Sequence, residues 1–176
     1  MTARRAVFLD RDGVLNEPIV KDGKPYPPKD LPELQICDGA PGACSDLKRA
    51  GFVLVVVTNQ PDVARGTQER AVVENMNGEL ARLMDIDDFN VCYHDDAQAC
   101  ECRKPKPGLL IAAAKKLSID LRKSFMVGDR WRDVDAGIAA GCRTVFIERG
   151  YNEGKIIRAD FTANSLRQAA NWILGL

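Results

Sequence analysis

The feature that most constrains the fold is an uninterrupted apolar run that ends abruptly in polar residues. The run is Phe52-Val53-Leu54-Val55-Val56-Val57, and Thr58-Asn59-Gln60 follow it. Continuous β-branched runs are typical of strands buried on both faces of a parallel sheet. Ligands of such sheets bind beyond the carboxyl ends of the strands, so polar residues placed there face a crevice. The run therefore predicts an α/β protein with a site at one edge of its sheet.

Other strand-length apolar runs alternate with helical patterns along the chain. We expect further strands at 6–9, 89–94, 124–127 and 143–147, and helices that begin near Asp38, Thr67, Leu109, Trp131 and Asn164. Gly141 is expected to end the fourth helix and Asn164 to cap the last one. Segments 17–36 and 149–163 lack periodicity and are expected to be loops, the first with a short extended piece at 34–36. This alternation predicts a doubly wound parallel sheet with helices on both faces.

Length and charge limit the possible partners. The 176 residues, 45% of them hydrophobic, suit a single domain spanning 1–176. Lys plus Arg equals Asp plus Glu at 25 each, so neither nucleic acid nor a membrane surface is an expected partner. There is no signal-peptide pattern and no apolar stretch of membrane-spanning length. We therefore expect a cytoplasmic protein, and a monomer.

Acidic or hydroxyl groups follow three of the expected strands. They are Asp10 and Asp12 after the first, Thr58 after the second, and Asp129 with Asp133 one helical turn later. If these ends converge, the carboxylates repel one another unless a cation such as Mg²⁺ lies among them. Asp-x-Asp-Gly also occurs in ordinary turns, and the Asp129–Asp133 segment also fits an N-cap followed by a solvated helix face. Their combination favours a magnesium site.

Positive charge is concentrated just before the third expected helix, in Arg103-Lys104-Pro105-Lys106-Pro107-Gly108. A helix N-terminus favours anions, so this segment predicts an anionic ligand, most plausibly a phosphate. The alternative is a solvated basic turn.

A loop preceding this basic segment carries the ligand set of a metal site. Cys92, His94, Cys100 and Cys102 offer three thiolates and one imidazole. This set, rather than the spacing, predicts a closed structural zinc site that holds Arg103 and Lys104 at the crevice. The alternative is a group of reduced surface cysteines, which would be reactive. The three remaining cysteines, Cys37, Cys44 and Cys142, are expected to be small core residues.

Together these motifs resemble the four motifs of the haloacid dehalogenase superfamily of phosphatases. The matching residues are Asp10-x-Asp12-Gly13, Thr58-Asn59, Lys104, and Gly128-Asp129 with Asp133. The resemblance implies a Rossmann-like sheet of order 3-2-1-4-5, whose first and fourth strands lie side by side at a switch point. It also implies Mg²⁺-dependent hydrolysis of phosphate monoesters.

The resemblance assigns a role to each motif residue. Asp10 would be the nucleophile that forms an aspartyl-phosphate, and Asp12 the general acid and base. Mg²⁺ would be bound by Asp10, Asp129 and the main-chain carbonyl of Asp12. Lys104 and the Thr58 hydroxyl would hold the phosphoryl oxygens. Asp133 would orient Lys104 or a metal-bound water.

The zinc loop narrows the resemblance to the subfamily of D-glycero-D-manno-heptose 1,7-bisphosphate phosphatases and histidinol-phosphatases. Three motifs support this narrower resemblance: Cys-x-Cys-Arg-Lys-Pro, Asp-Arg-Asp-Gly-Val-Leu-Asn and Ala64-Arg65-Gly66. The last of them favours the heptose enzymes. Members have no large cap domain, and the short segments here leave no room for one. Specificity is therefore expected from loops, including the segment near Tyr26. The residues expected to contact a phosphorylated metabolite, here a sugar bisphosphate whose 7-phosphate is removed, are Asn59, Gln60, Arg65 and Arg103.

The sequence differs from the subfamily pattern in two places, and three alternative functions stay open. Pro61-Asp62 replaces the usual Ser-Gly, which adds negative charge beside the sugar, and Tyr93 stands where proline is common in a zinc loop that is short. The first alternative is a histidinol-phosphate phosphatase. The second is a phospho-accepting receiver domain, against which Asp12 argues because a stable signal is poorly served by a resident acid and base. The third is a zinc-stabilised binding protein without catalysis.

Overall fold

The structure is a computed structural model that describes residues 3–152 and 158–176. Six parallel strands form its main sheet: β1 Ala6–Leu9, β4 Val53–Asn59, β5 Asp88–Cys92, β6 Phe125–Gly128, β7 Arg143–Ile147 and β8 Phe161–Ala163. The α-helices are α1 Ala40–Arg49, α2 Arg70–Met84, α3 Gly108–Leu117, α4 Trp131–Ala140 and α5 Leu166–Leu174. The predicted α/β architecture is confirmed.

Along the sheet the strands run β5-β4-β1-β6-β7-β8. The five expected strands thus lie in the order 3-2-1-4-5, and β8 adds a sixth at one edge. β1 pairs in parallel with both β4 and β6, so it occupies the middle of the sheet. The carboxyl ends of β1, β4 and β6 therefore meet at one place.

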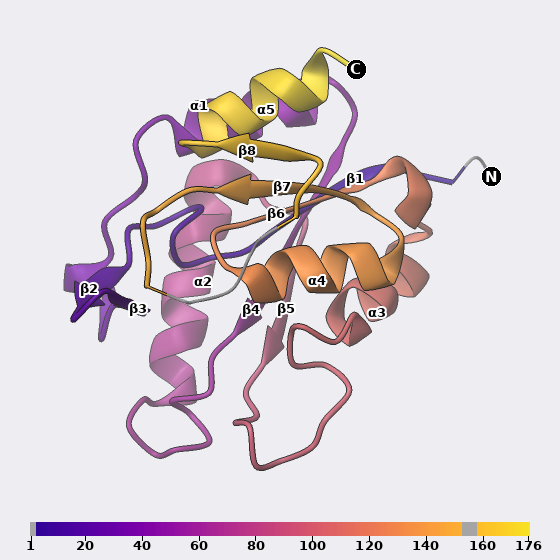
Figure 1. Ribbon diagram of the computed structural model, residues 1–176. Helices are drawn as coiled ribbons and strands as arrows, with labels where there is room; N and C mark the ends of the chain where they lie inside the picture. The colour runs from indigo at the N-terminus through magenta and orange to yellow at the C-terminus, as the bar shows by residue number, and fades with distance from the viewer. Residues whose placement is uncertain (1–2, 153–157) are drawn as a thin grey trace.

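Helices cover both faces of the sheet (Figure 1). α1 and α5 lie on one face and α3 and α4 on the other. The strand side chains alternate between the two cores: Val7 and Leu9 pack in the first, whereas Ala6 and Phe8 pack in the second. None of the helices in the described part of the chain is long and apolar enough to cross a membrane.

The structure differs from the sequence-based predictions in three places. Segment 17–36 contains a hairpin of β2 Ile19–Lys21 and β3 Lys24–Tyr26, followed by a 3₁₀ turn at Leu31–Glu33. The turn residues Asp22 and Gly23 have φ of 51° and 72°, and an Asp-Gly pair with positive φ at both residues favours two-residue hairpins. In segment 149–163, expected to be a loop, the last three residues form β8. The last helix is capped by the Ser165 side chain, which accepts from Gln168 N, rather than by Asn164.

Two smaller expectations are confirmed. Gly141 ends α4 with a φ of 82°, a left-handed conformation that glycine adopts without strain. Cys37, Cys44 and Cys142 are all buried.

Candidate active site

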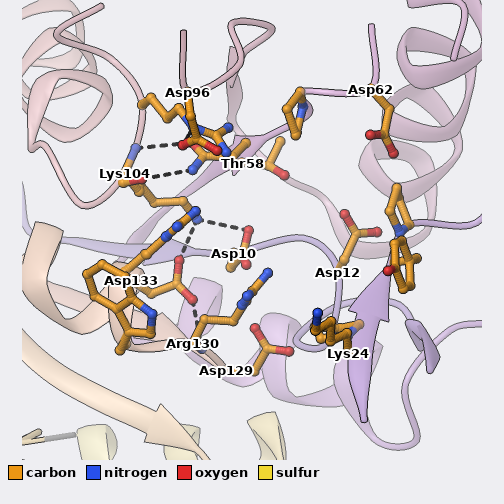
Figure 2. A pocket seen from close by; sticks show the side chains of 18 of the residues that line it. Asp10, Asp12, Lys24, Thr58, Asp62, Asp96, Lys104, Asp129, Arg130 and Asp133 are labelled. Atoms are coloured by element: carbon orange, nitrogen blue, oxygen red, sulfur yellow. Dashed lines mark hydrogen bonds and ion pairs between the residues drawn. The ribbon is translucent and has the colours of Figure 1, made fainter. Parts of the chain in front are cut away.

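A pocket of about 540 Å³ lies at the carboxyl ends of β1, β4 and β6. Its floor carries Asp10, Thr58, Lys104, Asp129 and Asp133, and Figure 2 shows these side chains converging from separate segments of the chain. Its walls and rim are formed by the β2–β3 hairpin, the loop after β4, the loop after β5 and the start of α4. The lining residues of these elements include Lys24, Tyr26, Asp62, Arg65, Asp96, Arg103, Arg130, Trp131 and Arg132.

Lys104 is buried at the floor between two carboxylates (Figure 2). Its Nζ lies 3.0 Å from Asp10 Oδ1 and 2.6 Å from Asp133 Oδ1, and it donates to the Val57 carbonyl at 2.7 Å. Burial alone would lower the pKa of Lys104, but the two carboxylates raise this pKa above its usual range. The floor therefore keeps a permanent cation that can hold a phosphoryl oxygen.

Carboxylate oxygens of Asp10, Asp129 and Asp133 lie within 4.8 Å of one another. Burial, followed by the charge of Asp133, raises the pKa of Asp10 to about 7. Burial and the neighbouring carboxylates also raise the pKa of Asp129 well above its ordinary value. Asp129 Oδ1 is buried and has no hydrogen-bond partner among the described residues. A hard divalent cation would relieve the repulsion and bind this oxygen, so the residues present fit Mg²⁺.

Gly13 allows the acidic turn after β1 to approach Asp129. Its φ is 85°, and a Cβ at this position would lie 1.7 Å from Asp129 Oδ2. Any side chain here would therefore be strained and would clash with the Asp129 carboxylate. The glycine of the predicted Asp-x-Asp-Gly motif thus serves both the turn and the close approach.

Asp12 is held on the pocket wall by three side chains, and its carboxylate is outside the acidic cluster. The fully buried Arg11 guanidinium donates to both Asp12 oxygens at 3.1 Å, and Asn77 of α2 accepts from Arg11 at 3.2 Å. Gln60 and Asn16 donate to Asp12 at 2.8 and 3.0 Å. The carboxylate therefore has a fixed position across the pocket from Lys104.

The polar residues after β4 support the floor. The Gln60 amide, which is buried, also donates to Thr58 Oγ1 at 3.0 Å, and so connects Thr58 to Asp12. The Asn59 amide exchanges two hydrogen bonds with the backbone of Lys104, of 3.0 and 3.1 Å. Both side-chain amides were expected to contact the substrate. In the structure Gln60 hydrogen-bonds to Asp12 and Thr58, and Asn59 hydrogen-bonds to Lys104.

Arg65 and Arg103 lie at the rim and are paired with carboxylates. Arg65 Nη1 is 3.2 Å from Asp62 Oδ1, and its Nη2 is 3.7 Å from Asp96 Oδ2. Arg103 Nε donates to Asp96 Oδ1 at 2.9 Å. Asp62, one of the two departures from the subfamily pattern, therefore lies where it offsets the charge of Arg65.

The four expected zinc ligands come together in the loop between β5 and α3. The three Sγ atoms and His94 Nδ1 lie within 4.8 Å of one another. Cys102 Sγ is 3.2 Å from Cys92 Sγ and 3.3 Å from His94 Nδ1. Ligands of a tetrahedral ion with Zn–S bonds of about 2.3 Å have separations of similar size. The cluster therefore fits zinc with four protein ligands.

This zinc loop also positions the rim. A Cβ at residue 108 would lie 2.2 Å from the Glu101 carbonyl oxygen, so Gly108 lets the loop pack against the start of α3. Arg103 Nη1 donates to the His94 carbonyl at 3.2 Å. The loop therefore holds the Arg103 guanidinium at the mouth of the pocket.

Comparison with known proteins supplies the family. The chain is 40% identical to the D-glycero-beta-D-manno-heptose-1,7-bisphosphate 7-phosphatase of Yersinia pestis, over 96% of this chain and 89% of the relative. The enzyme of the same name from Escherichia coli (strain K12) is 38% identical over 96% and 87%. The chain belongs to this family of phosphatases. Residues 101–169 also match the HAD-hydrolase-like family, which confirms the resemblance to haloacid dehalogenase-type phosphatases.

Solved structures of this heptose bisphosphate phosphatase family have the same fold. The D,D-heptose 1,7-bisphosphate phosphatase of B. bronchiseptica, complexed with magnesium and phosphate, matches with a TM-score of 0.85 and 28% identity, over 97% of this chain and 98% of that one. The enzyme from Burkholderia thailandensis matches with a TM-score of 0.68 and 26% identity, over 98% and 100%.

Sequence reasoning did not single out several side chains of the site. Arg11 could have been predicted as a site residue, because it lies between the two aspartates of the motif. Trp131 and Arg132, which line the pocket, lie between Asp129 and Asp133 but in a stretch that also fits a solvated helix. Tyr151, whose hydroxyl donates to Asp129 Oδ2 at 2.7 Å, had no signal because it lies 22 residues away in an aperiodic segment.

Proposed function

We propose that this chain is a Mg²⁺-dependent phosphomonoesterase that removes the 7-phosphate of D-glycero-D-manno-heptose 1,7-bisphosphate. The observation that supports it most is the buried Lys104 ammonium between Asp10 and Asp133, together with an oxygen of Asp129 that has no partner in the described part of the chain. Such a floor combines a nucleophile, a phosphate-binding cation and a cation site. The names of the relatives give the substrate.

In this proposal Asp10 is the nucleophile. Its Oδ1 accepts from Arg11 N at 2.8 Å and contacts Lys104, so the carboxylate is oriented before substrate binds. A carboxylate oxygen attacks phosphorus, the bond from phosphorus to the sugar oxygen breaks, and an aspartyl-phosphate forms. Lys104 and the Thr58 hydroxyl bind the phosphoryl oxygens as charge moves onto them.

Asp12 transfers the protons in both halves of the reaction. It gives a proton to the leaving sugar oxygen, and then takes one from the water that attacks the aspartyl-phosphate. Arg11, Asn16 and Gln60 hold the carboxylate in place for both steps. Mg²⁺ bound by Asp10, Asp129 and the Asp12 carbonyl would neutralise charge between the nucleophile and the phosphate dianion. Asp133 orients Lys104 through their 2.6 Å contact.

The rim accounts for recognition of the sugar. We infer that Arg65 and Arg103 contact the bisphosphate, and that Cys92, His94, Cys100 and Cys102 bind a structural zinc ion that holds this loop. Residues 1–176 then act as a single domain, in which loops rather than a cap domain recognise the substrate.

A comparison of two substrates tests the proposal. We expect Mg²⁺-dependent phosphate release with kcat/KM for D-glycero-D-manno-heptose 1,7-bisphosphate at least about 100-fold above that for histidinol phosphate, because a second phosphate adds charge pairing at the rim. Chelation of Mg²⁺ should stop the reaction. A preference for histidinol phosphate would overturn the substrate, and phosphate release without Mg²⁺ would overturn the mechanism.

A further inference from the structure

The segment that follows β7 crosses the acidic turn and reaches the floor of the pocket. Tyr151, which is half-buried in this segment, donates its hydroxyl hydrogen to Asp129 Oδ2 at 2.7 Å. The other oxygen of the same carboxylate, Oδ1, is buried and has no partner among residues 3–152 and 158–176. We propose that Tyr151 is a positioning residue that orients Asp129 as a ligand of the divalent cation, an inference that rests on the proposed function.

The two oxygens of Asp129 have different surroundings, and this difference supports the proposal. Oδ2 is enclosed by the Tyr151 hydroxyl and by Gly13, where a Cβ would lie 1.7 Å from Oδ2 and 3.1 Å from the hydroxyl. A hydrogen bond to one oxygen stops the carboxylate from rotating about its terminal bond, whose torsional preference is otherwise broad. The bond therefore fixes the orientation of Oδ1, the buried oxygen that has no hydrogen-bond partner among the described residues.

Arg149 explains how a residue in an aperiodic segment can hold a fixed position. Its guanidinium donates to the Gly13 carbonyl at 3.0 Å, to Glu17 at 2.8 Å and to Cys37 Sγ at 3.1 Å. These contacts fasten the segment to both sides of the acidic turn, two residues before Tyr151. The same turn that carries Asp10 thereby also sets the orientation of its partner Asp129.

Outer hydrogen bonds to metal ligands typically change metal affinity by 10- to 100-fold. Removing the Tyr151 hydroxyl should therefore weaken cation binding without moving the phosphate-binding groups, because Lys104 and Thr58 make no contact with it in the described structure. A residue that only stabilised the fold would lower the melting temperature instead.

The test is Tyr151→Phe, with Thr162→Val as the control. Thr162 is exposed on β8 and is not among the pocket-lining residues, so this variant removes a hydroxyl elsewhere. Mn²⁺ binding is measured by electron paramagnetic resonance on zinc-loaded protein, and Mg²⁺ activation is measured in parallel. For Tyr151→Phe we expect Mn²⁺ binding about tenfold weaker and a Mg²⁺ activation constant about tenfold higher, with substrate KM at saturating Mg²⁺ and the melting temperature unchanged.

Each outcome decides a separate point. Mn²⁺ affinity equal to that of wild type in Tyr151→Phe overturns the inference. A loss of affinity as large in Thr162→Val, or a loss accompanied by a lower melting temperature, assigns Tyr151 a structural role and also overturns it. If wild-type protein binds no Mn²⁺, the proposed magnesium site itself fails.

Discussion

The floor and the rim of the pocket both pair acidic with basic side chains, but they do so in opposite environments. At the floor, Lys104 and Asp133 are each 2% exposed and their charged atoms lie 2.6 Å apart. At the rim, Arg65 and Asp62 are 46% and 26% exposed and their charged atoms lie 3.2 Å apart. Water and salt screen the second pair and leave the first almost unscreened.

This difference indicates how the work of the site is divided. Removing Lys104 would leave its two buried carboxylate partners without a cation in a poorly solvated place. The floor is therefore suited to chemistry that every substrate shares. Exposed pairs contribute little to folding, so the rim can change with the sugar it recognises.

The largest expected effect is at Asp10, the proposed nucleophile. Asp10→Asn should lower kcat at least about 10³-fold, since an amide does not form the aspartyl-phosphate. Phosphate release over time measures it, with Thr162→Val as the control. Activity within tenfold of wild type would show that another group attacks phosphorus.

The same substitution has an expected effect on stability in metal-free protein. Burial and then the charge of Asp133 raise the pKa of Asp10 from its ordinary 3.8 to about 7, so the folded state binds more protons than the unfolded state between these values. Stability of the wild type should therefore fall as pH rises from about 4 to about 7. Urea unfolding should show Asp10→Asn to be more stable than wild type at pH 8, and a less stable variant would contradict the pKa shift.

The next effect compares two lysines two positions apart. At pH 8, Lys104→Met should lower the free energy of unfolding by about 3 kcal/mol, because Asp10 and Asp133 lose their buried partner. Lys106→Met should cause no measurable change, because Lys106 pairs with the exposed Glu101. Urea unfolding without added Mg²⁺ compares them, and equal losses would remove the distinction between buried and exposed charge pairs.

Part of the floor could be predicted from the sequence, because Asp10 and Asp129 directly follow buried strands and Thr58 lies near the end of one. Asp10, Thr58 and Asp129 are recognisable from an apolar run that ends in a polar residue, and parallel order brings such ends together. The cluster of Cys92, His94, Cys100 and Cys102 was predicted from residue types alone, and the structure brings these four residues together. In both cases the signal is local: a polar residue at the end of an apolar run, or several possible metal ligands in one short loop.

What escaped prediction depends on contacts between distant segments. Tyr151 reaches Asp129 from a distant segment that Arg149 fastens to the acidic turn. The strand β8 is three residues long and is set by pairing with β7 rather than by its own pattern. The β2–β3 hairpin did have a local signal in its Asp-Gly turn, and that signal was outweighed by the prolines around it.

A smaller effect is expected where the zinc loop supports the rim. Cys102→Ser should reduce bound zinc from about one per chain to less than half, and should raise KM several-fold with little change in kcat, since Arg103 is held through His94. Metal analysis and steady-state kinetics measure both quantities. Cys142→Ser, which alters a buried cysteine outside the cluster, should keep its zinc. A variant that loses zinc and keeps its KM would separate the loop from substrate recognition.

The smallest effect is expected at the departure from the subfamily pattern. Asp62→Asn removes the carboxylate nearest Arg65 while keeping the size of the side chain, so Arg65 should attract an anionic substrate more strongly. We expect kcat/KM for the bisphosphate to rise about two- to threefold at low ionic strength, as is usual for one exposed charge pair. At 1 M salt, where the Debye length is about 3 Å, the gain should vanish.

Glu79→Gln, which removes an exposed carboxylate paired with Arg82 on α2, is the control and should leave kcat/KM unchanged at both salt concentrations. A fall in kcat/KM for Asp62→Asn that persists at high salt would mean that Asp62 holds Arg65 in its binding position. At the rim, as at the floor, removing one charge of a pair would then disturb the other.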